Sequence, residues 1–288
     1  LYNFSGIFAG NLAALVTSGQ KVILSHIGGI SSVFSKRMRF IEKYMLFNTT
    51  QFIYNSNSTK SVFEYFGIKR KNSEVLYNGI ELAAQSSCSN KDFNVFKFIS
   101  VGRVTKNKNI EFNLRLIKEL KEAGVRLEYD IIGDGPNLNE VRTLVSQLNL
   151  DSIVTIHGFI TDPLSSIAFH NSHFIFCCSF SETFGLSVVE AMSKGIVPIV
   201  SSIGGLPEVV TNDKSGLVLN SNIDISEIVQ NQIPVKMVWN ECLGRVTSTK
   251  DVCLAKSTER ILDVLKDEKR YNYLSENALK KSSRFSID

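Results

Sequence analysis

Long apolar runs are missing from this sequence. No stretch approaches the ~18 consecutive apolar residues that cross a bilayer, and the first residues lack the charged-then-apolar plan of a signal peptide. The five cysteines are odd in number, include the adjacent pair Cys177 and Cys178, and show no Cys-x-x-Cys spacing. These absences argue against a membrane span, a disulfide framework and a cysteine metal site. We therefore expect reduced, packed thiols in a cytoplasmic protein.

A strong excess of one charge is also missing. The 32 basic and 28 acidic residues leave a net charge of +4, which is too slight to indicate a nucleic-acid partner. Hydrophobic residues make up 43% of the chain and charged residues 21%, as in ordinary folded proteins. Because single hydrophobic cores stop growing near about 250 residues, the 288 residues of this chain predict two domains.

Strand and helix patterns alternate along most of the chain. In the first segment we expect helices over 1–20, 35–47 and 58–66 and strands over 21–26, 51–54 and 74–76. After a polar stretch at 85–91 the pattern restarts, with a helix over 110–123 and strands over 96–101, 127–132, 153–157, 174–177 and 196–200. Residues 230–256 look irregular, and only two further helices are expected, over 258–265 and 271–281.

The strands of the second segment are apolar enough to be covered by helices on both faces. That pattern is typical of a parallel, doubly wound sheet. We therefore predict an α/β fold with one domain over 1–90 and a second over 91–288. Ligands in such sheets bind at the carboxyl ends of the strands, so we expect the ligand site in the loops that follow the strands.

Two of these loops have residues suited to phosphate. In the loop over 101–109, Arg103 has a planar fork that fits two phosphate oxygens and Lys108 supplies a mobile point charge. The loop could instead be a solvated basic turn. In the next loop, over 131–136, Gly133 and Gly135 let the backbone turn sharply and approach a ligand. This turn is weak evidence alone, since no Gly-x-Gly-x-x-Gly fingerprint occurs.

A third loop, over 181–192, has two glutamates. Glu182 and Glu190 are eight residues apart, close to two helical turns, so we expect one carboxylate before the helix and one within it to face the same side and reach one ligand. Two acids along an apolar helix face need hydroxyl donors, which a sugar and a ribose supply. The alternative is that one glutamate caps the helix and the other lies on its wet face.

Taken in order, these motifs resemble family 4 retaining glycosyltransferases of the GT-B fold. The resemblance covers about residues 20–220 and is carried by Gly102-Arg103 with Lys108, Gly133-Asp134-Gly135-Pro136, the two glutamates around Phe184-Gly185-Leu186, and Gly204-Gly205-Leu206-Pro207-Glu208. It includes Asn78-Gly79-Ile80, where Glu81 stands in place of the family's aspartate. The resemblance implies two Rossmann-like domains that face a cleft.

The resemblance also implies roles for single residues. Arg103 and Lys108 would bind the diphosphate of a nucleotide-sugar donor, and Glu190 would hold the ribose hydroxyls. Glu182 would contact the transferred sugar. The donor-binding set is completed by the turn at Gly133 and Gly135, the backbone N–H groups of Phe184, Gly185 and Leu186, and the loop at Phe159 and Ile160, which would border the base.

The implied reaction moves a sugar to a glycan or lipid-linked acceptor with retention of configuration, in polysaccharide or lipopolysaccharide biosynthesis. No Asp-x-Asp pair occurs, so the sequence requires no metal and no cofactor, and cationic side chains can stabilise the leaving diphosphate. No carboxylate is well placed as a nucleophile, which fits a front-face transfer in which the departing phosphate helps deprotonate the acceptor. The catalytic candidates are therefore Glu182, Arg103, Lys108 and His26.

Three further features concern histidines and a basic segment, and two of them allow two interpretations each. His26, at the end of a strand, either faces the donor sugar or is a packed or surface imidazole. His170 and His173 lack a third ligand, so we expect no metal pair. The segment 35–47 mixes four cations with large apolar groups at helical spacing, so it is either a solvated helix or a peripheral contact with an anionic inner membrane surface.

The chain also departs from the family pattern. Residues 1–90 are about half of an acceptor domain, and the glycine-rich loop after its first strand is absent, so we expect an N-terminally truncated first domain and an intact donor site. Whether the fragment is active or inactive in transfer stays open. Two other functions stay open. One is a nucleotide-sugar epimerase of similar fold, and the other is a non-catalytic nucleotide-sugar-binding module.

Overall fold

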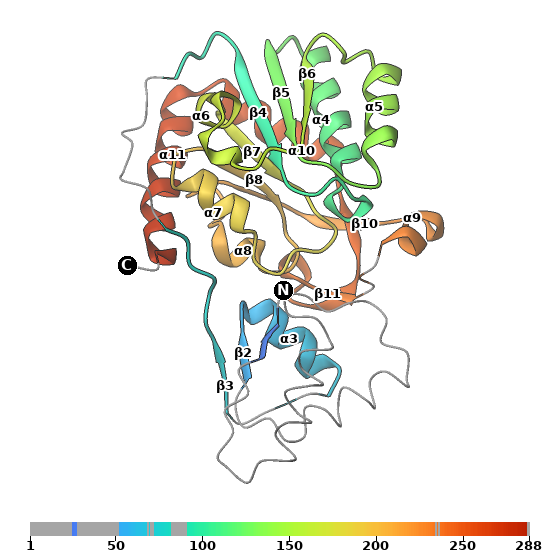
Figure 1. Cartoon of the computed structure of the whole chain (residues 1–288), viewed down its shortest axis with the longest axis vertical. Helices are drawn as coiled ribbons and strands as arrows, with labels where there is room; N and C mark the ends of the chain where they lie inside the picture. The colour runs from blue at the N-terminus through green and yellow to red at the C-terminus, as the bar shows by residue number, and fades with distance from the viewer. Residues whose placement is uncertain are drawn as a thin grey trace.

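Six parallel strands form the main sheet of the protein (Figure 1). The structure is a computed structural model that describes residues 25–27, 52–67, 69, 72–81, 91–233, 235 and 237–286. In the order β6-β5-β4-β7-β8-β9, the strands of the sheet are β6 (Val154–Gly158), β5 (Leu127–Ile132), β4 (Phe96–Val101), β7 (Phe174–Cys177), β8 (Val197–Ser201) and β9 (Leu217–Leu219). The order reverses between β4 and β7, and a crevice opens at such a point outside the carboxyl ends of the strands.

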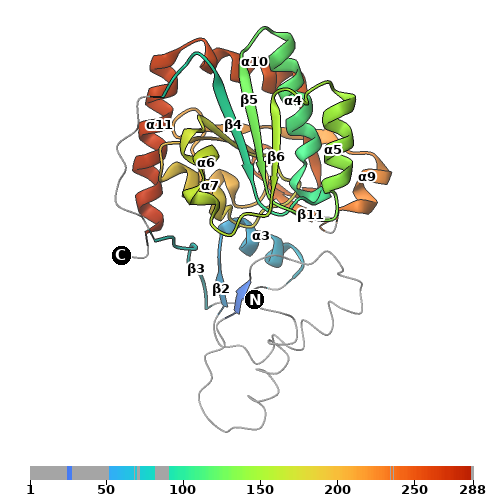
Figure 2. The same ribbon diagram turned by 45° about the horizontal axis from the view of Figure 1, so that its top comes forward.

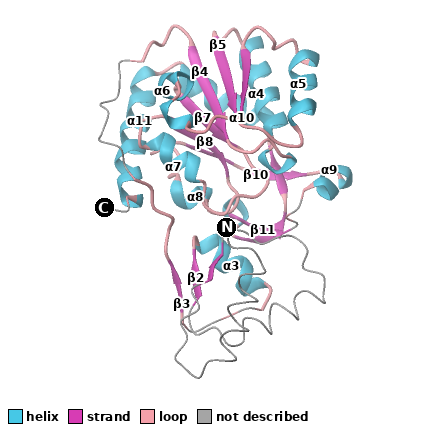
Figure 3. Cartoon of the chain, viewed as in Figure 1, coloured by secondary structure: helices cyan, strands magenta, loops and turns pink. Residues whose placement is uncertain are grey.

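Helices cover both faces of this sheet, as Figure 3 shows. The helices of this region are α4 (Ile110–Glu122), α5 (Leu138–Gln147), α6 (Ile167–Asn171), α7 (Leu186–Met192), α8 (Leu206–Val209), α10 (Leu254–Leu265) and α11 (Glu268–Ser282). Helix α4 packs against α5 and α10, whereas α7 packs against α11. The predicted α/β fold with a doubly wound parallel sheet is confirmed.

Alternating strand residues divide the core between the two faces. Phe98 and Ile131 belong to the cluster beneath α4, α5 and α10, whereas their neighbours Ile99 and Ile132 belong to a cluster beneath α6 and α7. This is the period of two that a strand buried on both faces must have. Helix α11 contributes to both sides, with Leu274 in the first cluster and its later residues in a third cluster around α7 and α8.

A second, smaller sheet lies beside the carboxyl ends of the main strands (Figures 1 and 2). Its parallel strands are β1 (Ser25–Ile27), β2 (Phe52–Tyr54) and β3 (Ser73–Val75), and helix α3 (Asn57–Tyr65) follows β2. Helix α3 lies between this sheet and the rest of the chain and packs against β11 (Met237–Asn240). The helices predicted over 1–20 and 35–47 lie outside the described residues.

The expectation of an irregular segment over 230–256 is wrong. This region has two antiparallel ribbons: β10 (Ser221–Asp224) pairs with β13 (Lys250–Val252), and β11 pairs with β12 (Arg245–Ser248). Helix α9 (Glu227–Gln232) precedes β11, and the short turns of the chain are η1 (Lys106–Lys108), η2 (Pro163–Ser165), η3 (Glu241–Leu243) and η4 (Ser283–Phe285). Strands of three or four residues are too short to show a period of two in the sequence.

The other predicted elements lie within a few residues of the observed ones. Strands β4, β5 and β7 match their predicted bounds, and β6 and β8 each begin one residue later than predicted. The predicted stop of α4 is confirmed, because Gly124 has a φ of +85° directly after it. Within the described ranges, no helix is long and apolar enough to cross a membrane.

His173 makes the stability of this fold depend on pH. Burial, followed by the positive charge of Lys91, lowers its pKa from 6.5 to about 4. Between these values the unfolded chain binds more protons than the folded one, so stability falls as pH falls from about 6.5 to about 4. The loss is about 3 kcal/mol.

We expect His173→Asn to remove most of this dependence. Asparagine keeps an acceptor for the Lys97 N–H, which donates to His173 Nδ1 at 3.0 Å, but it does not titrate. Urea unfolding at pH 7 and at pH 4 measures the effect, with the exposed His170→Asn as the matched control. An equal fall in stability in His173→Asn and His170→Asn would contradict this account.

Candidate functional site

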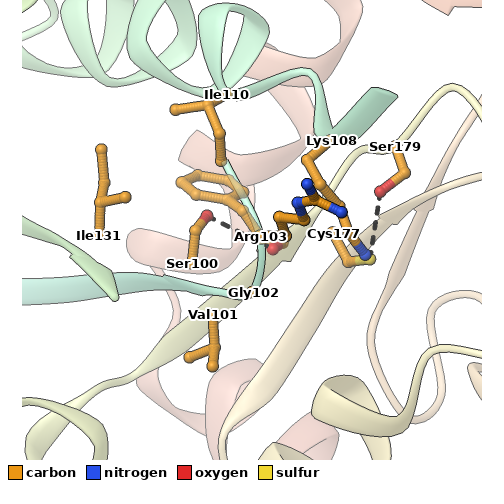
Figure 4. Close-up of a pocket in the computed structure, with 10 residues that line it drawn as sticks. Ser100, Val101, Gly102, Arg103, Lys108, Ile110, Ile131, Cys177 and Ser179 are labelled. Atoms are coloured by element: carbon orange, nitrogen blue, oxygen red, sulfur yellow. Dashed lines mark hydrogen bonds between the residues drawn. The ribbon is translucent and has the colours of Figure 1, made fainter. Parts of the chain in front are cut away.

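A pocket opens at the reversal point of the main sheet (Figure 4). Arg103 and Lys108 reach it from the loop after β4, and Cys177 and Ser179 reach it from the end of β7. Burial raises the pKa of the Cys177 thiol, so this wall of the pocket is neutral. The remaining lining residues are Ser100, Val101, Gly102, Ile110, Ile131 and Phe176. The pocket thus sets two cationic side chains over an apolar floor, which suits an anionic ligand.

Lys108 is held in place by Glu182. Its Nζ lies 2.6 Å from Glu182 Oε2, and both side chains are largely buried. Burial opposes the charge of the ammonium group, but the attraction of Glu182 and their hydrogen bond outweigh it and keep the pKa of Lys108 above its ordinary value. Lys108 is therefore a fixed positive charge at any ordinary pH. Glu182 also lines a neighbouring pocket between α3 and the β11–β12 ribbon.

Asn107 ties the first and third loops together. Its side-chain Nδ2 donates to the Ser181 carbonyl at 2.8 Å, and its own carbonyl accepts from the Phe180 N–H at 2.8 Å. Asn107 directly precedes Lys108, and Ser181 directly precedes Glu182. These bonds therefore hold the backbones of the two loops together beside the ion pair. The sequence analysis missed Asn107, since an asparagine in a polar loop has no pattern of its own.

The glycines of the second loop contact the protein's own backbone. A Cβ on Gly133 would lie 1.9 Å from the Gly102 carbonyl oxygen, and one on Gly135 would lie 2.2 Å from that of Val104. The sharp turn expected at Gly133 is present, with φ +147°. The close approach that was expected toward a ligand is made to the first loop, and contact of these glycines with a donor stays a prediction.

A second pair of glycines supports Glu182 from behind. A Cβ on Gly204 would lie 1.8 Å from the Glu182 carbonyl oxygen, and the Gly205 N–H donates to the same oxygen at 2.9 Å. The backbone of Glu182 is thus held on one side by these glycines, while its side chain is held on the other by Lys108. Only residues without a side chain allow this approach.

Glu182 lies before helix α7 and Glu190 lies on it, as predicted, because α7 begins at Leu186 after Gly185 with φ +95°. The spacing of two helical turns does not apply to the residues before Leu186, so that both carboxylates reach one ligand stays a prediction. The described residues provide no hydrogen-bond donor or cation for the Glu190 carboxyl group, and burial raises its pKa. An uncompensated, half-buried carboxyl group is the kind of acceptor that ligand hydroxyls satisfy.

The remaining predicted site residues are the start of α7, the loop at 159–160 and His26. The backbone N–H groups of Phe184, Gly185 and Leu186 make no hydrogen bond to any described residue, which leaves them open at the start of α7. Phe159, which was predicted to border a base, is 76% exposed, and Ile160 packs against the core beside it. His26 lies within β1, and its side chain is outside what the structure describes.

A family model described as "Glycosyl transferases group 1" matches residues 84–233, which is more than half of the chain and includes every loop just described. The chain belongs to this family. The matched range of this group 1 glycosyltransferase chain includes every residue that lines the pocket. Among the residues that the structure covers, no group of three or more His, Cys, Asp or Glu side chains is arranged to hold a metal ion.

Named relatives and solved structures agree with the family. WcaL of Escherichia coli K12, a putative colanic acid biosynthesis glycosyltransferase, is 32% identical over 133 residues, or 44% of this chain and 32% of WcaL. The uncharacterized glycosyltransferase MJ1607 of Methanocaldococcus jannaschii is 27% identical over 216 residues, or 70% of this chain and 55% of the relative. The match thus spans about a third of the first relative and about half of the second.

Solved glycosyltransferases share the fold. Anabaena Alr3699/HepE, in complex with UDP and glucose, aligns with a TM-score of 0.75 at 17% identity over 98% of this chain and 72% of its own. The C-terminal domain of the group 1 protein LpcC from Francisella tularensis aligns with a TM-score of 0.53 at 18% identity over 73% of this chain and all of that domain. At these identities the alignments support the GT-B fold alone.

Proposed function

We propose that this chain binds a nucleotide-diphosphate sugar and forms the donor side of a retaining glycosyltransferase of family 4. The observation that carries the proposal is the pair of cations, Arg103 and Lys108, in a pocket at the reversal point of a parallel sheet. A diphosphate has two charged groups side by side, and a guanidinium beside an ammonium matches that pattern. Alr3699/HepE, which shares the fold, was solved with UDP, so uridine nucleotides are the first to test.

The remaining groups suit the rest of a nucleotide sugar. The carboxyl group of Glu190 would accept from the ribose hydroxyls and so replace the water that burial removes. The open N–H groups at Phe184, Gly185 and Leu186 would face phosphate or sugar oxygens. Glu182, already fixed by Lys108, would accept from hydroxyls of the transferred sugar.

In the proposed reaction the bond between the anomeric carbon and the β-phosphate oxygen breaks, and the acceptor oxygen bonds to the same face of that carbon. The acceptor proton passes to the departing phosphate. Lys108 and Arg103 stabilise the charge that grows on the diphosphate as it leaves, and electrostatic stabilisation of this kind is the largest catalytic contribution in many enzymes. Side chains can provide it without a metal ion.

The wider assignment rests on the family and on WcaL. We propose a glycan or lipid-linked acceptor, a place in polysaccharide or lipopolysaccharide assembly, and a cytoplasmic location with peripheral membrane contact through residues 35–47. The relation to WcaL, named for colanic acid biosynthesis, supports the polysaccharide assignment. The division into domains over 1–90 and 91–288 belongs to the same proposal.

A thermal-shift panel of nucleoside diphosphates and nucleotide sugars tests the proposal. A ligand that binds only the folded state at a hundred times its Kd stabilises it by about 2.7 kcal/mol, so one nucleotide family should raise the Tm. We expect Arg103→Ala and Glu190→Ala each to weaken this binding at least about tenfold, because each removes a charged hydrogen-bonding group.

Arg126→Ala and Glu119→Ala are the matched controls for this panel. Both residues are exposed, and Arg126 directly precedes β5, at the opposite end of the strands from the pocket. A panel without any stabilising nucleotide would reject the proposed function. Unchanged affinity in both Arg103→Ala and Glu190→Ala would reject the assigned donor site.

A further inference from the structure

A carboxylate of the main body hydrogen-bonds the segment that surrounds the second sheet. Glu208, on α8 of the main body, accepts hydrogen bonds from the backbone N–H groups of Asn57 and Ser58 at 2.9 and 2.8 Å. It also accepts from Asn57 Nδ2 and from the Tyr77 hydroxyl, both at 2.9 Å. More than 130 residues separate Glu208 from each of these donors in the chain.

The contact is favourable for a reason of charge. Asn57 and Ser58 are the first two residues of α3, whose free N–H groups give this end a partial positive charge. The first turn of α3 has no acidic residue of its own. Glu208 therefore supplies from the main body the anion that the helix lacks.

Tyr77 extends this contact to the proposed donor loop. Its ring stacks on Phe184 with a centroid distance of 5.8 Å, and it meets Phe285 edge-on at 5.7 Å. Burial, then the charge of Glu208, raises the pKa of Tyr77 to about 12, so its hydroxyl remains a donor to the carboxylate. Phe184 directly precedes the open N–H groups of Gly185 and Leu186.

Glu208 is also close in sequence to a residue that holds the backbone of Glu182. It lies three residues after Gly205, whose N–H donates to the Glu182 carbonyl. One short segment thus holds the backbone of Glu182 at one end and α3 at the other. Helix α3 in turn lines the pocket that Glu182 shares with the β11–β12 ribbon.

We propose that Glu208 is a positioning residue, which holds α3 and Tyr77 against the donor loop so that an occupied donor site and the second sheet are coupled. The proposal rests on the proposed function, since it takes the loop at 182–186 as the donor loop. Donor binding would then order α3, which lines the neighbouring pocket beside Glu182. The first turn of α3 would report that order.

Amide hydrogen exchange of the whole chain tests the coupling. Exchange is measured with and without one nucleoside diphosphate, namely whichever of UDP, ADP and GDP gives the largest thermal shift. In the unaltered protein we expect the nucleotide to slow exchange in peptides covering 57–65. In Glu208→Gln, where one acceptor oxygen and the charge are lost, exchange there should be at least tenfold faster and no longer respond to nucleotide. Nucleotide Kd should stay within threefold.

Two further variants keep the test sharp. Tyr77→Phe keeps the ring but removes one of the four hydrogen bonds to Glu208 and the bond that Asn57 Nδ2 donates to the Tyr77 hydroxyl at 3.0 Å. Three bonds to Glu208 remain, so this variant should give a smaller increase in the same peptides even if Glu208→Gln folds poorly. Glu128→Gln is the matched control, because that carboxylate pairs with Lys97 within the main sheet and should leave exchange in α3 unchanged.

The outcomes separate the two proposals. Slower exchange in α3 on nucleotide binding, abolished in Glu208→Gln, supports the coupling. Nucleotide binding that leaves α3 unchanged, or an equal response in Glu208→Gln, would overturn the coupling while the proposed function stands. If no nucleotide binds the unaltered protein, the proposed function fails and the coupling falls with it, whatever the exchange rates in Glu208→Gln.

Discussion

Lys108→Met is expected to lower sugar transfer by a factor on the order of 100 to 1,000. The substitution removes the ammonium group that faces the proposed diphosphate, and it leaves Glu182 buried without its cation. A preorganised charge at a leaving group contributes roughly 3 to 4 kcal/mol to transition-state stabilisation, which sets this range. Calorimetric titration with nucleoside diphosphate, followed by measurement of nucleoside diphosphate release from the nucleotide sugar, checks binding and turnover in turn.

Lys106→Met is the matched control for this variant. Lys106 lies in the same short turn, but it pairs with Glu111 and lines a different pocket. We expect its donor affinity to stay within about threefold, because it loses the same charge without losing a ligand contact. The double variant Lys108→Met with Glu182→Gln should regain stability but not binding. Equal losses in Lys106→Met and Lys108→Met would show that only the total charge of the loop matters.

Gly204→Ala should destabilise the folded state by more than about 4 kcal/mol, enough to leave most of the protein unfolded or insoluble. An alanine Cβ here would lie 1.8 Å from the Glu182 carbonyl oxygen, so the backbone on one side must move. That movement would also break the hydrogen bond from Gly205 and displace Glu182 from Lys108. Urea unfolding measures the loss, and any folded protein should bind donor poorly.

Gly244→Ala separates the clash from the backbone conformation. Gly204 and Gly244 have nearly the same φ, +62° and +59°, but nothing lies within 4 Å of a Cβ on Gly244. Both variants bear the left-handed penalty of about 1 kcal/mol, and only Gly204→Ala adds the contact. Similar losses in the two variants would mean that the Glu182 loop moves aside without cost.

The fold was accessible to sequence because its core strands are apolar on both faces. Strands such as β4 and β8 stand out from any flanking loop, and Gly124 ends α4 with a single recognisable residue. The ribbons between β10 and β13 were missed for the opposite reason. Their strands have mixed burial and only three or four residues, so hydrophobic period carries no information about them.

The candidate site was only partly accessible. Arg103 and Lys108 were singled out by their chemistry, and the structure brings both to one pocket. The pairing of Lys108 with Glu182 spans 74 residues, and no local pattern encodes it. Glu208 was seen only as part of a motif, because its hydrogen bonds to α3 depend on how two distant segments meet.

The sequence predicts that the glycines of the second loop approach a ligand, whereas in the structure they approach the first loop. A glycine signals that something comes close, but it does not say what does, and at Gly133 the neighbour is the Gly102 carbonyl. Spacing is also incomplete evidence for Glu182 and Glu190. Eight residues correspond to two turns only inside a helix, and α7 begins at Leu186, so the spacing alone does not fix where the Glu182 side chain lies.

Helix α11 closes the molecule on two sides at once. Its first half, with Leu274, packs in the core of one face, and its second half, with Ala278, packs in the core of the other, before Phe285 reaches Phe184 and Tyr77. A shortened piece that stopped before residue 268 would leave bare apolar surface on opposite sides of the sheet. A shortened chain for crystallisation should therefore keep α11, because residue 268 is not a domain boundary.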